Sequence, residues 1–139
     1  MTVRRGATRA SDLWVYDAAR GTPTRLTFDG SNWSNWSPDG KRLVFGKGRL
    51  FVTSADGVGK AEQLTTGEAN QLVSSWSPAG IAFLQRVSDS ANGIWVLSPD
   101  GGAKPRLFIE SSFALWHPAF SPDGRWMAYV SHESGGDGV

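Results

Sequence analysis

The stretch Trp36-Ser37-Pro38-Asp39-Gly40 decides the fold, because it recurs twice more along the chain with small changes. It returns as Trp76-Ser77-Pro78-Ala79-Gly80 and again as Phe120-Ser121-Pro122-Asp123-Gly124. Self-similarity at a period of about 40 residues is typical of the blades of a β-propeller. Pro presets the φ of the first central turn residue, and Gly accepts the positive φ that closes a hairpin. We therefore expect a hairpin at each copy, tightened or shifted in register where Ala79 replaces the turn Asp.

Three further motifs recur in phase with this turn. An apolar strand after the turn lies at residues 43–45, 81–83 and 127–129. A second strand, rich in β-formers, lies at residues 13–17, 50–54 and 94–98. A third strand, with a polar start, lies at residues 25–27, 63–65 and 106–108. With the strand that leads into the turn, each repeat has four strands. No segment has a helical period of useful length. The predicted fold class is all-β, a propeller built of four-stranded antiparallel blades.

These motifs resemble the TolB-like group of β-propeller repeats, which combine an aromatic-Ser-Pro-Asp-Gly turn with Ile-Trp/Tyr-Val and Arg-Leu-Thr strands. The resemblance covers residues 11–131. It implies that the strand leading into the turn is innermost and that the Arg-Leu-Thr strand is outermost. Such repeats occur in cell-envelope translocation proteins, receptor kinases and peptidase-like enzymes, so the resemblance specifies no single function. It alone implies a periplasmic or extracytoplasmic location, and the chain shows no signal peptide.

The blade order implied by the resemblance makes the chain start in mid-blade. The chain then divides into a half blade of outer strands at residues 11–27, two complete blades at 33–65 and 72–108, and a half blade of inner strands at 115–131. Together these parts amount to three blade equivalents. Residues 1–10 are expected to form a flexible arm or a remnant strand, and residues 132–139 a flexible tail. Open strand edges and apolar blade faces drive association. We expect the partner to be a second copy, in a homodimer of six blades, or the rest of a longer propeller.

Composition excludes several other partners. The 14 basic and 13 acidic residues nearly cancel, so no summed field favours nucleic acid or an anionic membrane surface. No apolar stretch reaches the roughly 18 residues that a membrane-spanning helix needs. There is no cysteine, which excludes disulfides and thiolate metal sites and leaves the compartment open.

Catalytic groups are scarce. The chain has no Gly-x-Ser-x-Gly nucleophile elbow, and its two histidines, His117 and His132, form no His-Glu-x-x-His pattern. Asp39 and Asp123 are interpreted as turn residues rather than calcium ligands. We therefore expect no enzymatic activity, no metal and no cofactor.

Most of the aromatic residues are expected to pack between blades. Trp14 and Trp95 align with Phe51, and Trp36 and Trp76 align with Phe120. Large apolar side chains at equivalent positions of successive repeats are what face-to-face blade packing requires. These tryptophans are therefore assigned to the core.

The candidate binding residues lie at positions where the repeats differ. Three tryptophans have no aromatic counterpart at the same offset, His117 occupies the innermost strand, and two asparagines lie where loops lead into inner strands. Loops that vary in length and composition are the usual carriers of recognition. The predicted ligand or partner site therefore comprises Trp33, Asn32, Asn70, Trp116, His117 and Trp126.

The function expected from these features is that of a non-catalytic binding or protein-interaction scaffold. One alternative is that the chain is the non-catalytic propeller part of a larger enzyme or receptor kinase. Another is a carbohydrate-binding propeller with Trp33, Trp116 or Trp126 as stacking platforms.

Overall fold

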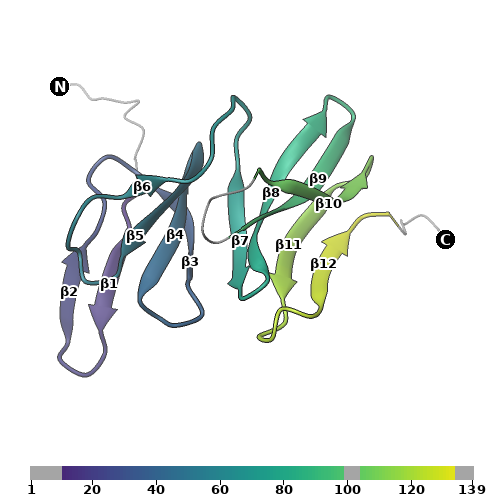
Figure 1. Ribbon diagram of the computed structural model, residues 1–139. Helices are drawn as coiled ribbons and strands as arrows, with labels where there is room; N and C mark the ends of the chain where they lie inside the picture. Colours follow the sequence, from purple (N-terminus) through teal and green to yellow (C-terminus); the bar gives the residue numbers. More distant parts are fainter. Residues whose placement is uncertain (1–10, 99–103, 134–139) are drawn as a thin grey trace, which may run out of the picture.

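The computed structural model describes residues 11–98 and 104–133, and all its regular elements are β-strands (Figure 1). The predicted arm at 1–10 and most of the predicted tail, 134–139, lie outside the described residues. The strands are β1 (Trp14–Asp17), β2 (Thr22–Arg25), β3 (Asn32–Trp36), β4 (Arg42–Lys47), β5 (Arg49–Ser54), β6 (Glu62–Gln63), β7 (Leu72–Ser77), β8 (Gly80–Ser88), β9 (Ala91–Leu97), β10 (Arg106–Ser111), β11 (Leu115–Phe120) and β12 (Met127–Ser131).

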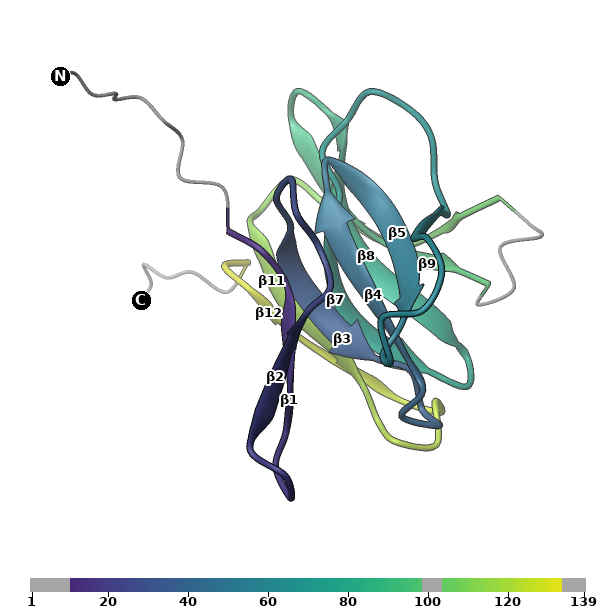
Figure 2. The ribbon, with the colours of Figure 1, turned by 90° about the vertical axis from the view of Figure 1, so that its left-hand side faces the viewer.

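The strands form four antiparallel sheets that follow one another along the chain. Two sheets have four strands, in the orders β3-β4-β5-β6 and β10-β9-β8-β7, and two have two strands, β1-β2 and β11-β12. Figure 1 shows the two-stranded sheets at opposite ends of the row, and Figure 2 looks along it. The expectation of an all-β fold with four-stranded antiparallel sheets is confirmed. No sheet closes on itself within the described part of the chain.

The Ser-Pro-Asp-Gly turns share one set of hydrogen bonds. The Ser37 hydroxyl donates to the Asp39 carboxylate at 2.7 Å, and the Ser121 hydroxyl donates to the Asp123 carboxylate at 2.6 Å. These hydroxyl bonds, and then a backbone N–H two residues on, hold the pKa of both carboxyls below its usual value. The two aspartates therefore serve the turns that contain them.

The turn that carries Ala79 is tighter, as expected. Ser77 pairs directly with Gly80 across it, whereas the copy with Asp first pairs Trp36 with Leu43. The second copy has two residues fewer between its paired positions, since Trp76 and Ile81 are five residues apart whereas Trp36 and Leu43 are seven apart. The chain therefore closes over two residues, and the Ala79 N–H donates to the Ser77 hydroxyl at 3.0 Å.

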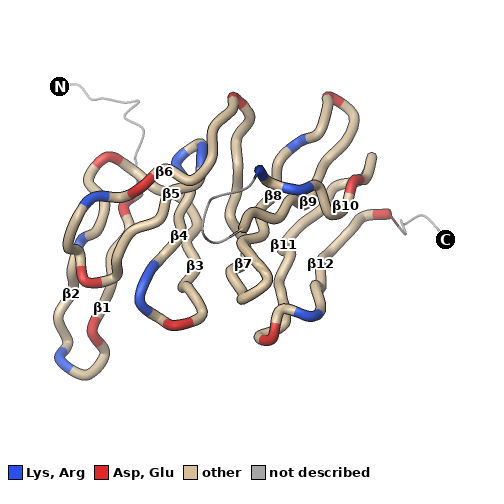
Figure 3. The backbone as a smooth tube through the Cα atoms, in the orientation of Figure 1, with Lys and Arg blue, Asp and Glu red and all other residues tan. Residues whose placement is uncertain are grey.

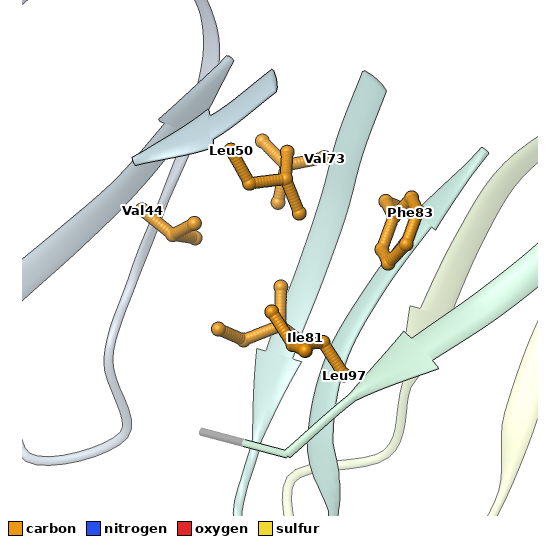
Figure 4. Packing of buried hydrophobic residues seen from close by; sticks show 6 residues of the cluster. All are labelled: Val44, Leu50, Val73, Ile81, Phe83 and Leu97. Carbon is orange, nitrogen blue, oxygen red and sulfur yellow. The ribbon is translucent and has the colours of Figure 1, made fainter. Parts of the chain in front are cut away.

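The hydrophobic core lies between the two four-stranded sheets (Figure 4). Val44 and Leu50 of one sheet meet Val73, Ile81, Phe83 and Leu97 of the other. Each of these side chains is almost fully buried, and burial of a side chain of this size contributes about 1.5–3 kcal/mol. Trp76 and Trp95 pack against this cluster, which confirms their assignment to the core.

The same assignment is wrong for Trp14 and Trp36, both of which are about half exposed. Trp14 lies on the two-stranded β1-β2 sheet, and Trp36 lies on the face of β3-β6 turned away from the core cluster. No described sheet covers either indole. Burial between blades requires a neighbouring sheet as well as the right residue.

Candidate functional site

Each strand that leads into a Ser-Pro turn departs from regular pairing near its start. Strands β3, β7 and β11 show register shifts between residues 32 and 34, 73 and 75, and 116 and 119. Bulges of this kind bend the strand and re-aim side chains, and they are frequent beside functional sites. We call the end of the sheets at which these three strands begin the entry end; it lies at the top of Figure 1.

Two of these bulges contain strained backbone. Trp33 has φ of 38° and His117 has φ of 51°, and no other non-glycine residue of the described chain has a positive φ. A left-handed conformation costs a bulky residue about 1–2 kcal/mol. Such strain concentrates at binding and active sites, where the surrounding structure holds it in place. Both side chains are exposed at the entry end.

A pocket of about 400 Å³ opens at the entry end, between the β7–β10 sheet and the start of β11. It brings together two predicted residues, Asn70 before β7 and Trp116 on β11. Its walls are largely apolar and include Ala69, Leu72, Leu84, Ala114, Leu115 and Trp116. Concave, mostly apolar pockets with a few polar groups are the usual form of binding sites.

The polar rim of this pocket consists of amides and one cation. The Gln85 side-chain oxygen accepts a 2.8 Å hydrogen bond from Gln71, which is itself buried and bonded to the Thr65 hydroxyl. Asn92 donates from its side-chain nitrogen to the Phe113 carbonyl at 3.0 Å. These bonds orient the amides and leave one end of each free among the described residues. The rim also includes Arg86, which has no carboxylate partner in the described part of the chain.

A second pocket, of about 410 Å³, lies at the same end, beside the starts of β1 and β3. It contains the other predicted pair, Asn32 and Trp33, together with the hydroxyl groups of Ser11, Ser31 and Ser34. The two pockets therefore occupy similar places, each beside the start of an inner strand.

Asp12 holds the wall of this second pocket. Its carboxylate accepts hydrogen bonds from the Arg25 guanidinium at 2.6 Å, the Thr27 hydroxyl at 2.9 Å and the Gly30 N–H at 2.9 Å. The Arg25 bond is the largest of the effects that lower the pKa of Asp12. Sequence reasoning missed this network, although the Thr of the Arg-Leu-Thr motif was a usable signal.

Trp126 lies apart from the other predicted residues. It follows the Ser-Pro-Asp-Gly turn between β11 and β12, at the opposite end from the two pockets (Figure 1). The indole is exposed and the Arg125 guanidinium lies over it, 5.4 Å from the ring centre. The structure therefore divides the predicted set into Asn70 with Trp116 and His117, Asn32 with Trp33, and Trp126 alone.

Charge and metal-binding groups are dispersed over the described residues. Figure 3 shows Lys and Arg interspersed with Asp and Glu along the described parts of the backbone. Residues 11–98 and 104–133 contain no group of three or more His, Cys, Asp or Glu that could hold a metal ion. In the same ranges no helix is long and apolar enough to cross a membrane.

Sequential four-stranded antiparallel sheets packed face to face resemble the blades of a β-propeller. The chain is similar in structure to a candidate TolB from Agrobacterium tumefaciens, with a TM-score of 0.66 and 19% sequence identity. The match covers 86% of this chain and 50% of that one. At this identity the likeness shows the fold, which is TolB-like. No protein-family model matches the chain.

Two curated relatives match the sequence. An uncharacterised protein of Agrobacterium fabrum, Atu1656, is 29% identical over an alignment of 130 residues that covers 89% of this chain and 44% of that protein. An uncharacterised peptidase of Bacillus subtilis, YuxL, is 28% identical over an alignment of 166 positions that covers 88% of this chain and 25% of the peptidase. The chain therefore spans less than half the length of either relative.

Proposed function

We propose that the chain is a non-catalytic binding scaffold of the TolB-like propeller type, with its recognition surface at the entry end. One observation carries the proposal: Asn70, in the loop before β7, and Trp116, on β11 of another sheet, line one pocket beside the strained His117. An exposed indole at the edge of an apolar pocket is a typical anchor of a protein interface.

The chemistry of the pocket favours a peptide segment of a partner protein. Its apolar walls suit the aliphatic or aromatic side chains of such a segment. The free amide ends of Gln85 and Asn92, with the whole amide of Asn70, suit the alternating N–H and C=O groups of an extended backbone.

A peptide-display selection against the purified chain tests this proposal. Truncation of a central aromatic anchor typically costs about 2 kcal/mol or more, so Trp116→Ala should weaken selected peptides roughly 30-fold. Phe108→Ala is the matched control, because this exposed aromatic lies on the outer strand β10 and lines neither pocket. Equal binding by wild type and Trp116→Ala would refute the site.

Two other functions have a specific observation behind them. The likeness to a peptidase supports a non-catalytic propeller part of a larger enzyme, and a longer reading frame with a nucleophile elbow would establish it. The hydroxyl-rich pocket at Trp33 supports carbohydrate binding, because sugars stack on indoles and bond to hydroxyls. A glycan array without hits would count against the second function.

The absence of catalysis is part of the proposal and rests on the sequence, which has no nucleophile elbow. Purified chain should not hydrolyse ester or peptide substrates above the rate in buffer. The proposal also includes a closed ring of six blades, in which neighbouring blades would cover the apolar faces of the end sheets.

A further inference from the structure

The pocket between the β7–β10 sheet and β11 has apolar walls and one charged residue, Arg86. Phe83 of β8 packs in the core against the neighbouring four-stranded sheet. Side chains alternate along a strand, so Leu84 and Arg86 share a face, with Leu84 opposite to Phe83. The pairing of β8 with β9 is regular from Phe83 to Arg86, so nothing breaks this alternation. Leu84 and Arg86 therefore lie on the face turned towards β11 (Figure 1).

The strands beside β8 extend this surface. Leu72 of β7 pairs with Leu84, and Asn92 of β9 pairs with Arg86. Directly paired residues lie on the same face of a sheet, and both partners line the pocket. Trp116 of β11 lines it from the other side. The pocket therefore has an apolar end at Leu84 and a cationic end at Arg86, two residues or about 7 Å apart along the strand.

No acidic side chain neutralises Arg86 among the described residues. Its guanidinium donates to the backbone carbonyl of Asp89, and it takes part in none of the ion pairs in the described chain. Glu110 of β10 pairs with Gly93, the residue next to Asn92, so it lies on the other face of the sheet. A guanidinium has five N–H donors. Arg86 therefore keeps both its charge and most of its donors for a ligand.

We propose that this pocket recognises an acidic peptide segment in which an apolar residue and an Asp or Glu are two positions apart. The inference rests on the proposed peptide-binding function of the same pocket and names the sequence that it selects. The apolar side chain packs against Leu84 and Trp116, and the carboxylate pairs with Arg86. Guanidinium and carboxylate groups form charge-assisted hydrogen bonds, frequently two in parallel.

The spacing of the two peptide residues follows from the geometry of an extended chain. Side chains two positions apart lie on the same side of an extended peptide, about 7 Å from each other, as Leu84 and Arg86 do on β8. A residue directly beside the apolar one points to the opposite side, away from Arg86. The α-carboxylate of a C-terminal apolar residue lies only about 2.5 Å from its own Cβ, which matches the separation less well. The geometry therefore favours an acidic side chain.

The expected contribution of the charge is modest. Arg86 is exposed, so water and salt screen its pair with a carboxylate. An exposed ion pair typically changes affinity by no more than about fivefold. Arg86 should therefore determine which peptides are preferred, while Trp116 provides most of the affinity.

Selected peptides and their synthetic versions test this selectivity. The peptides from the display selection should be enriched in apolar-x-Asp and apolar-x-Glu sequences. One of them is then made with Asp, Asn or Lys at the acidic position, each with an amidated C-terminus. The wild-type chain should bind the Asp version about fivefold more tightly than the Asn version, and the difference should shrink in about 0.5 M salt.

Charge reversal at Arg86 should reverse the preference. Arg86→Glu should bind the Lys version more tightly than the Asp version, because the unlike pair is now with Lys. Arg106→Glu is the matched control, since it changes the net charge equally, is exposed on β10 and lines neither pocket. It should keep the wild-type order. A variant that failed to fold would bind neither version, so a reversed order does not come from unfolding.

The outcomes separate this inference from the proposed function. If Trp116→Ala weakens binding but the wild-type chain binds the Asp and Asn versions equally, the pocket binds peptides and the acidic selectivity is wrong. The wild-type order retained in Arg86→Glu would overturn the role of Arg86. Binding that is lost on C-terminal amidation would assign the charge to the α-carboxylate and contradict the spacing. Binding that is unaffected by Trp116→Ala would instead refute the proposed site itself.

Discussion

The left-handed backbone at Trp33 and His117 predicts an unusual order of stability for glycine and alanine variants. In a regular strand, glycine is less stable than alanine by about 0.5–1 kcal/mol, because it loses more backbone entropy on folding. A residue with a Cβ adopts a left-handed φ at a cost of about 1–2 kcal/mol, which glycine avoids. With φ at 38° and 51°, both positions incur this cost. His117→Gly should therefore be more stable than His117→Ala by roughly 0.5–1 kcal/mol.

Strand β7 provides the matched control within the same chain. Ser74 lies at its register shift, as Trp33 and His117 lie at theirs, but it has no positive φ. Ser74→Gly should therefore be less stable than Ser74→Ala by about 0.5–1 kcal/mol, the usual order. The order of the two variants is thus expected to reverse between β7 and the two strained strands.

Urea unfolding followed by tryptophan fluorescence measures each difference. His117 and Ser74 pairs keep every tryptophan, so their signals compare directly, and all proteins are measured at one concentration because association shifts apparent stability. Each kcal/mol should also move the melting temperature by roughly 2–5 °C for a chain of this size. If glycine is the less stable variant at position 117 as well as at 74, the strain argument is wrong.

The remaining predictions concern the core and the Asp12 network. Phe83→Ala should cost about 3–5 kcal/mol in urea unfolding, whereas truncation of the exposed Val58 should cost no more than about 0.5 kcal/mol. Because the pKa of Asp12 is lowered in the folded chain, the contribution of its carboxylate to folding stability is complete above the ordinary pKa of 3.8. This contribution is lost as the pH falls through the lower pKa of the folded chain. Asp12→Asn should thus destabilise the chain at pH 7 and reduce the fall in its urea midpoint towards pH 2; an unchanged fall would show that Asp12 makes no such contribution.

Local chemistry explains why much of the fold could be predicted from the sequence. The Ser37 hydroxyl and the Asp39 carboxylate bond to each other within one turn, so the turn depends on residues that are adjacent in sequence. The tighter turn at Ala79 was also predicted, and its length follows from the two residues that the second copy lacks between Gly80 and Ile81. The all-β class and the four-stranded antiparallel sheets followed from the spacing of such turns.

Burial could not be predicted in the same way. Trp36 and Trp76 occupy the same position in their repeats, yet only Trp76 packs against the core. The difference comes from the presence or absence of a neighbouring sheet. The convergence of Asn70 and Trp116 in one pocket likewise depends on how two sheets lie against each other.

The sequence by itself determined the strands and the turns, because backbone propensity and turn hydrogen bonds act between near neighbours. The order of strands within each sheet was implied by the resemblance to TolB-like repeats. Only the tertiary structure decided which faces are covered, where the entry-end pockets lie, and that Trp33 and His117 adopt left-handed φ. These properties arise from packing between segments far apart in the chain. No local pattern predicts them, because the same motif is buried where a neighbouring sheet covers it and exposed where no sheet does.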